Sequence, residues 1–288
     1  MDIGRNRGRR EMRGFSLIEM AVALFVLALL IGSILVPLST QVESRKYDDT
    51  QQALKQAREA LLGYVAATGR FPCPASATSN GAEHFFSPGG TANNGLCHSS
   101  ITSAAGTLAF VGFLPAATLG ITPVDDNGYA VDSWPRWDIG GVPQNRIRYA
   151  VARQTINSTS NCTATPVSLP FTKVDGMRTA GMSCIMNASS LPKVCNAAAG
   201  STPTSCASGA TLTANAIVVI WSLGPNASTS GGASADEAEN AEYPFTSADQ
   251  VFVSKVRSGA LGNEFDDIVT WISPPELFNR MIAAGQLP

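Results

Sequence analysis

Residues 13–20 of the chain read RGFSLIEM, and residues 21–38 continue as AVALFVLALLIGSILVPL. From Phe15 to Leu38 the only charged residue is Glu19. A run of this length can cross a bilayer as a helix, which takes about 20 apolar residues. Because a charge at membrane depth costs about 3 kcal/mol or more, a carboxylate in such a run usually has a function and a partner. The stretch therefore predicts a long N-terminal helix with a functional acid near its start.

Two simpler explanations account for the apolar segment less well. A secretory signal peptide has an apolar region of about 7–15 residues that ends at a small-residue A-x-A site. Here the run is longer, has no such site at its end and continues into a helical pattern. A plain membrane anchor explains the hydrophobicity and the arginines before it, but it does not explain Glu19.

The charges of the chain are unevenly placed. Residues 1–14 hold five arginines and two acids, a local charge of +3, whereas the whole chain carries −2. A basic leader before an apolar segment predicts a cytoplasmic start and an exported body. The rest of the chain has no basic excess, which argues against a nucleic-acid partner.

The string from Arg13 to Met20, placed between a basic leader and an unbroken apolar run, closely resembles the type IV prepilin signal. Pseudopilins of type II secretion carry the same signal. The resemblance implies that a membrane prepilin peptidase cuts after Gly14 and methylates the new N-terminal residue, Phe15. In a packed filament the new amine would be buried and would need a counter-charge, which Glu19 of a neighbouring subunit can supply.

The helix is expected to extend well beyond the apolar segment. Pro37 lies near the end of that segment and should kink the helix, as members of the resembled family often do in this region. Residues 39–69 are expected to continue as an amphipathic helix. It should end at Gly69, because Pro72 and Pro74 prevent its continuation. The apolar residues that recur at helical spacing on its predicted buried face are Tyr47, Leu54, Ala57, Leu61 and Val65.

Five apolar, β-branched runs predict strands in the remaining part of the chain. They are residues 108–114, 147–152, 216–223, 251–256 and 267–272. The turn at 257–263 suggests that the last two form an antiparallel hairpin. A capping-box pattern at 273–276 opens a short closing helix, in which Leu277, Met281 and Ile282 should face the sheet. A long helix packed on an antiparallel sheet is an α+β layout, and it matches the pilin-like fold that the resemblance implies.

The six cysteines, an even number that all lie outside the apolar segment, predict disulfides in an oxidising compartment. They are Cys73, Cys97, Cys162, Cys184, Cys195 and Cys206. Sequence proximity favours pairing them in this order, which would close the long loops of the head, although other connectivities and free thiols stay open.

Two acidic loops are weak candidates for calcium, which prefers several oxygen ligands and which some pseudopilins bind in their heads. Their candidate ligands are Asp125, Asp126, Asp132, Asp236, Glu237 and Glu239. Solvated loop acids are the favoured alternative, because neither loop has the EF-hand pattern. No other cofactor is expected.

Catalytic motifs are absent from the sequence. It has no G-x-S-x-G, no P-loop and no H-E-x-x-H, and its two histidines, His84 and His98, are interpreted as surface imidazoles. We therefore expect a protein that is not an enzyme.

Together these patterns predict a structural subunit of a type IV pilus-like filament, either a minor pilin or a pseudopilin of type II secretion. Its expected segments are a cleaved cytoplasmic leader (1–14), a transmembrane and filament-core helix (15–38), an amphipathic continuation (39–69) and a periplasmic β-rich head (70–288). The expected location is the bacterial inner membrane, in a single pass. The expected partners are other pilin-like subunits, bound through the N-terminal helix, and the prepilin peptidase. The alternative is a membrane-anchored periplasmic binding protein or enzyme with an uncleaved anchor.

Overall fold

The computed structural model describes residues 16–98, 109–156, 167–186, 188, 191–227, 234–241 and 250–287, without the side chains of 32–39, 155, 156 and 167. The chain divides into two units, Met1–Arg45 and Lys46–Pro288. The helices are α1 (Leu17–Thr68), α2 (Ala116–Leu119), α3 (Gly176–Ala180), α4 (Met182–Met186), α5 (Ala235–Asn240) and α6 (Pro274–Ala283). The strands are β1 (Ala109–Phe113), β2 (Asp138–Ile139), β3 (Val142–Pro143), β4 (Arg148–Ala152), β5 (Thr155–Ile156), β6 (Val167–Ser168), β7 (Lys193–Cys195), β8 (Thr211–Thr213), β9 (Val218–Ser222), β10 (Val251–Val253) and β11 (Ile268–Ile272).

The part of α1 in the second unit buries the face that its apolar spacing predicts. The core residues on this face, each at most 2% exposed, are Leu54, Ala57, Leu61 and Val65. Tyr47 is partly buried against the same core. Gly69 adopts a φ of +72° and donates its N–H to the Val65 carbonyl at 2.8 Å, which ends the helix at the predicted place.

A four-stranded antiparallel sheet carries the core of the second unit. Its strand order is β1-β4-β9-β11, so each of the five predicted strand regions except 251–256 contributes to it. The central strands β4 and β9 are buried at every position. Both faces of the sheet are covered, which explains why these strands are nearly continuous apolar runs rather than alternating ones.

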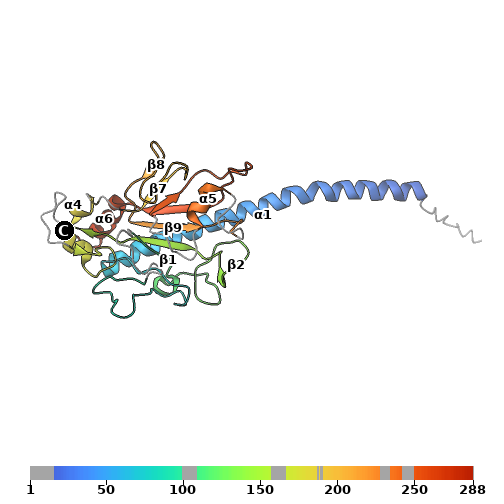
Figure 1. Cartoon of the computed structure of the whole chain (residues 1–288). Helices are drawn as coiled ribbons and strands as arrows, with labels where there is room; N and C mark the ends of the chain where they lie inside the picture. Colours follow the sequence, from blue (N-terminus) through green and yellow to red (C-terminus); the bar gives the residue numbers. More distant parts are fainter. Residues whose placement is uncertain are drawn as a thin grey trace, which may run out of the picture. The chain divides into compact units, whose positions relative to one another are not determined.

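The two faces of the sheet pack against different partners. On one face, Val151 of β4 lies in the same core cluster as Leu61 of α1. On the other face, Val219 and Trp221 of β9 pack with Phe252 of a smaller sheet, whose order is β10-β7-β8. The second unit therefore has three layers, formed by the helix, the main sheet and the small sheet (Figure 1).

The predicted hairpin between the last two strands is wrong. β10 pairs in parallel with β7, whereas β11 pairs antiparallel with β9 in the main sheet. The other edge of β10 is taken by Asn240 of α5, whose side-chain amide donates to the Val253 carbonyl and accepts from the Val253 N–H, both at 2.9 Å. Because both edges of β10 are occupied, β11 pairs elsewhere, and the intervening turn forms an isolated bridge between Ser258 and Phe265.

The predicted closing helix forms as α6, with Leu277 and Met281 fully buried. Ile282 is 48% exposed, so the prediction that it faces the sheet is wrong. Since an α-helix has about 3.6 residues per turn, the residue that follows an inward-facing Met281 points in a different direction.

Two contacts at the start of α6 fix its position. Glu276 accepts the backbone N–H of Ser273, whereas the Ser273 side chain makes no capping hydrogen bond, so the predicted capping box is half formed. Glu276 also pairs with Arg58 of α1 at 2.5 Å. The closing helix is thus attached directly to the long helix.

Disulfides close two loops of the second unit. Cys73 pairs with Cys97 and Cys195 pairs with Cys206, as sequence proximity favours. Cys184 is also disulfide-bonded, and its expected partner, Cys162, lies outside the described residues. None of the cysteines in the described part of the chain is a free thiol.

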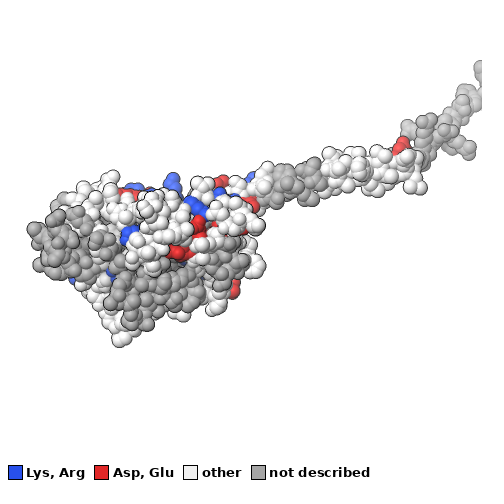
Figure 2. All heavy atoms as spheres, turned by 45° about the horizontal axis from the view of Figure 1, so that its top comes forward, with Lys and Arg blue, Asp and Glu red and all other residues white. Residues whose placement is uncertain are grey.

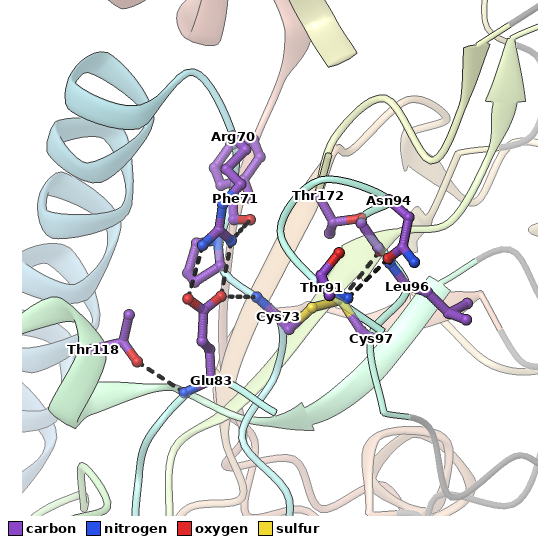
Figure 3. Close-up of a disulfide and its surroundings, with 12 residues drawn as sticks. Arg70, Phe71, Cys73, Glu83, Thr91, Asn94, Leu96, Cys97, Thr118 and Thr172 are labelled. Atoms are coloured by element: carbon purple, nitrogen blue, oxygen red, sulfur yellow. Dashed lines mark hydrogen bonds and ion pairs between the residues drawn. A yellow bond between two sulfur atoms is a disulfide. The ribbon is translucent and has the colours of Figure 1, made fainter. Parts of the chain in front are cut away.

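A buried ion pair holds the first disulfide loop against the end of α1 (Figure 3). The Arg70 guanidinium donates to both Glu83 carboxylate oxygens at 2.8 Å. Glu83 also accepts the Cys73 N–H at 3.2 Å, and its own N–H donates to the Thr118 hydroxyl at 2.8 Å. Arg70 and Glu83 therefore connect α1, the disulfide loop and α2.

Glu83→Ala is expected to lower the free energy of unfolding by about 3 kcal/mol, because it leaves the Arg70 guanidinium, 7% exposed, without its partner. Urea unfolding followed by circular dichroism measures the change. Asp138→Ala is the matched control, since Asp138 forms a bidentate pair with Arg136 that is about half exposed, at 50% and 44%. Equal effects of the two substitutions would contradict the role given to the Arg70–Glu83 pair.

Candidate functional site

The first turn of α1 contains a reciprocal pair of hydrogen bonds. The Ser16 backbone N–H donates to a Glu19 carboxylate oxygen at 2.9 Å, and the Glu19 N–H donates to the Ser16 hydroxyl at 3.2 Å. This is a capping box, which satisfies two of the backbone donors that a helix start leaves unpaired. It holds the Glu19 carboxylate at the beginning of the helix.

The helix that follows presents apolar side chains to its surroundings. Eleven large apolar residues between 17 and 31 are 47–90% exposed, namely Leu17, Ile18, Met20, Val22, Leu24, Phe25, Val26, Leu27, Leu29, Leu30 and Ile31. Figure 2 shows that the described surface of this stretch carries almost no charged atoms, in contrast to the mixed charges on the second unit. Apolar surface of this extent marks a site that contacts another apolar phase or another protein.

Glu19 lies on an open apolar face of this helix. Ile18, Glu19, Val22, Ala23, Val26 and Leu27 line a shallow groove along it. They form two adjacent rows, 18, 22, 26 and 19, 23, 27, in which successive residues are four positions apart and therefore lie on one helical face. The face therefore combines a carboxylate at its start with an aliphatic strip behind it.

Several predicted site residues cannot be placed. Gly14 and Phe15 lie outside the described residues, as does the side chain of Pro37, so cleavage, methylation and the kink stay predictions. Among the residues that are described, no helix combines the length and the apolar character needed to cross a membrane.

The acidic loops do not gather into a cation site. No group of three or more potential metal ligands occurs among the described residues, so the calcium prediction has no support there. Asp125 pairs with Arg146 at 2.7 Å, and Asp236 pairs with Lys255. Arg146 and Lys255 therefore neutralise two of the carboxylates that were predicted as calcium ligands.

The other calcium candidates belong to no potential metal-binding group among the described residues either. Glu237 accepts from the Asn226 side chain at 2.9 Å and from the Asp266 N–H at 3.0 Å. Asp126 is exposed in the turn after Asp125. Glu239 lies in α5, the short helix that also carries Glu237.

Asp132 is buried at a junction between loops, sheet and helix. It accepts the Trp134 N–H at 3.0 Å and the Ser222 hydroxyl at 2.6 Å. The next residue, Ser133, donates its N–H to the Thr50 hydroxyl of α1 at 3.2 Å. Burial raises the pKa of Asp132 to about 7, against the lowering effect of the bonds from Ser222 and Trp134. In this structure Asp132 joins the loop at Trp134 to β9, beside the contact of Ser133 with α1.

Sequence reasoning missed two features of the molecule. The Ser16–Glu19 cap has a recognisable signal, because serine followed three residues later by glutamate is the capping-box pattern. His84 and His98 were expected as separate surface imidazoles, whereas their rings stack against each other at 4.2 Å between centroids.

The comparison with protein families falls on the same N-terminal stretch. Residues 9–35 match the prokaryotic N-terminal methylation motif, which is the prepilin signal of type IV pilin-like proteins. No curated protein and no solved structure matches the chain. The motif supports a type IV pilin-like protein that prepilin peptidase processes, that associates with the membrane and that assembles with other pilins.

Asp132 is expected to make stability fall as the pH rises. At pH values well below its unfolded pKa of 3.8, Asp132 is protonated in both the folded and the unfolded chain, so its contribution is fully present. Between its unfolded pKa of 3.8 and its folded pKa of about 7, the carboxyl group is ionised in the unfolded chain but still protonated in the folded chain. Raising the pH through this range therefore stabilises the unfolded chain and lowers the free energy of unfolding by on the order of 4 kcal/mol.

Asp132→Asn should remove this part of the pH dependence, because the amide cannot ionise. Urea unfolding of the parent and the variant from pH 4 to pH 8 gives the comparison. Asp126→Asn, which changes an exposed acid of the preceding turn, is the control and should keep the parent's slope. An unchanged slope in Asp132→Asn would show that the buried carboxyl does not titrate in this range.

Proposed function

We propose that the chain is a minor subunit of a type IV pilus-like filament, either of a pilus or of a type II secretion system, in which the first part of α1 packs against neighbouring subunits. The observation that carries the proposal is the capped Glu19 at the start of an exposed apolar helix, inside the residues that match the methylation motif. A carboxylate held on such a face is a site for a cation that arrives with a partner.

The partner charge is the processed N-terminus of a neighbour. Cleavage after Gly14 removes the five leader arginines and leaves an amine on Phe15, which is then methylated. An amine buried among apolar helices needs a counter-charge, and a charged donor makes a stronger hydrogen bond than a backbone N–H does. Glu19 therefore exchanges the Ser16 N–H, its partner within the chain, for the neighbour's amine during assembly.

Before assembly, residues 15–38 store the subunit in the bacterial inner membrane in a single pass, with the C-terminal head in the periplasm. The exposed apolar side chains from Leu17 to Ile31 support this, as does the +3 charge of residues 1–14. The disulfides Cys73–Cys97 and Cys195–Cys206 are stable in an oxidising compartment such as the periplasm.

The size of the second unit favours a minor subunit. Lys46–Pro288 contains a main sheet, a second sheet behind it and several long loop segments. A major subunit repeats its head at close spacing along the filament, which favours compact heads. A head of this bulk fits better at or near the tip, where fewer copies have to be accommodated, and Glu19 still allows the subunit to dock with a neighbour.

Glu19→Ala is expected to reduce incorporation into filaments by about tenfold or more, because it removes the counter-charge for a buried amine. Membrane insertion should be unchanged or improved, since a costly charge is lost. The ratio of chain in sheared filaments to chain in membranes, measured by quantitative mass spectrometry, tests this.

Glu43→Ala is the matched control, because Glu43 is an exposed acid further along α1. Normal incorporation of Glu19→Ala would contradict the role of the carboxylate. The same measurement counts subunits, and if this chain were the most abundant one in the filaments, the minor-subunit proposal would fail.

A further inference from the structure

Two strongly exposed apolar side chains lie in one loop of the second unit. Val256 is 88% exposed and Leu261 is 98% exposed, whereas no other large apolar side chain in the described part of this unit is more than 51% exposed. Single apolar residues are common on protein surfaces, but apolar groups that gather in one exposed place mark a contact with another apolar phase or another protein. The loop formed by residues 256–263 is therefore a contact surface to be explained.

The base of the 256–263 loop is fixed to the rest of the second unit. Ser258 and Phe265 exchange both backbone hydrogen bonds, at 2.9 and 2.8 Å, and Phe265 is fully buried. The Lys255 ammonium donates to the Asn263 side-chain oxygen at 2.7 Å and pairs with Asp236 of α5. Because the base is held in this way, the loop keeps its apolar side chains outside the core.

The 256–263 loop adjoins the turn of α1 with which the second unit begins. The Arg257 guanidinium lies over the Tyr47 ring, 5.7 Å from its centroid. The segment that leads into β2 reaches the same turn, because the Ser133 N–H donates to the Thr50 hydroxyl at 3.2 Å. This segment carries Trp137, which is 51% exposed, and β2 lies at the end of the second unit where α1 enters it (Figure 1). Both loops therefore meet the helix within one turn.

The exposed side chains of the two loops are of the kinds that favour a membrane surface. Tryptophan is enriched at the headgroup level, where its ring contacts acyl chains and its N–H stays hydrated. Arginine binds phosphate groups through two parallel hydrogen bonds. Residues 256–263 contain Arg257 and no acid, and the acid beside Trp137, Asp138, is paired with Arg136. The surface therefore matches phospholipid in polarity and in charge.

The length of the chain keeps this surface close to the bilayer. The segment proposed to lie in the membrane ends at Leu38, nine residues before Tyr47. As a helix, these nine residues span about 14 Å. The headgroup region extends about 5–8 Å beyond the hydrocarbon core. The three residues from Ser258 to Leu261 cover about 10 Å when extended, so the loop is long enough to reach the headgroups.

We propose that Val256, Leu261 and Trp137 dock on the phospholipid headgroup layer of the membrane, with Arg257 on a phosphate group. The proposal rests on the proposed function, in which residues 15–38 store the subunit in that membrane. Docking holds the second unit on the membrane surface before assembly, and extraction of α1 into a filament separates the surface from the lipid.

The test reconstitutes the full chain into vesicles of phosphatidylethanolamine and phosphatidylglycerol with acyl chains brominated near the headgroup. Bromine quenches tryptophan fluorescence only at close contact, and Trp134 and Trp221 are buried. The parent is expected to be quenched, and Trp137→Phe should lose most of that quenching. The double variant Val256→Asp, Leu261→Asp should lower the quenching by about threefold, because charge replaces the apolar area that inserts.

Ile282→Asp is the matched control, because Ile282 is 48% exposed in α6, which lies near the other end of α1, where the Gln286 side chain donates to the Ala66 carbonyl at 3.1 Å. It should be quenched as the parent is. Circular dichroism establishes that each variant is folded, and flotation establishes that it is bound to the vesicles.

Flotation separates the two proposals. A chain that does not float with the vesicles would overturn membrane storage and docking together. A chain that floats while Trp137 stays unquenched, or a double variant that is quenched as the parent is, would overturn docking alone. A blue shift of the Trp137 emission without quenching would also overturn it, since another protein chain, such as a second copy, would then cover the surface.

Discussion

Burial of one face of α1 against the main sheet is the interaction on which the rest of the second unit depends. Leu61 and Val65 are fully buried in the core that this face shares with β4 and β9. Polar contacts attach other elements to the same helix: Arg58 pairs with α6, Thr50 accepts from the turn after Asp132, and Arg70, just past the helix end, holds the first disulfide loop. The same helix begins, at Ser16 and Glu19, with a capped carboxylate on an exposed apolar face.

Much of this fold follows from local patterns in the sequence. The 3.6-residue periodicity of α1 identified its buried face, and Gly69 with the following prolines identified its end, because both signals depend on neighbouring residues alone. The strands of the main sheet were predictable because nearly continuous apolar runs are typical of strands that are covered on both faces. The small sheet was missed as a unit, since β8 exposes much of its surface. Residues 251–256 were predicted as a strand, but not the contacts of β10 with β7 and with the Asn240 amide, because no periodicity links these residues.

The candidate site was predictable to a similar extent. Glu19 stood out because a charge interrupts an apolar run, and its capping partner Ser16 lies within the same four residues. The calcium prediction lacked support because Asp125 meets Arg146, which is 21 residues away, and such a pairing follows from the folded loop and not from its composition. The stacking of His84 on His98 was unpredictable for the same reason, because it depends on the folded arrangement of a loop that Arg70–Glu83 and Cys73–Cys97 hold in place.

We infer that the N-terminal segment is a prepilin signal, so that the exposed helix serves assembly and the leader is removed. N-terminal sequencing, combined with the intact mass of protein extracted from membranes, tests this inference. The expected result is a mature chain of the 274 residues from Phe15 to Pro288, with a methyl group on the Phe15 amine. A mature chain that retains Met1, or that begins at any residue other than Phe15, would contradict it.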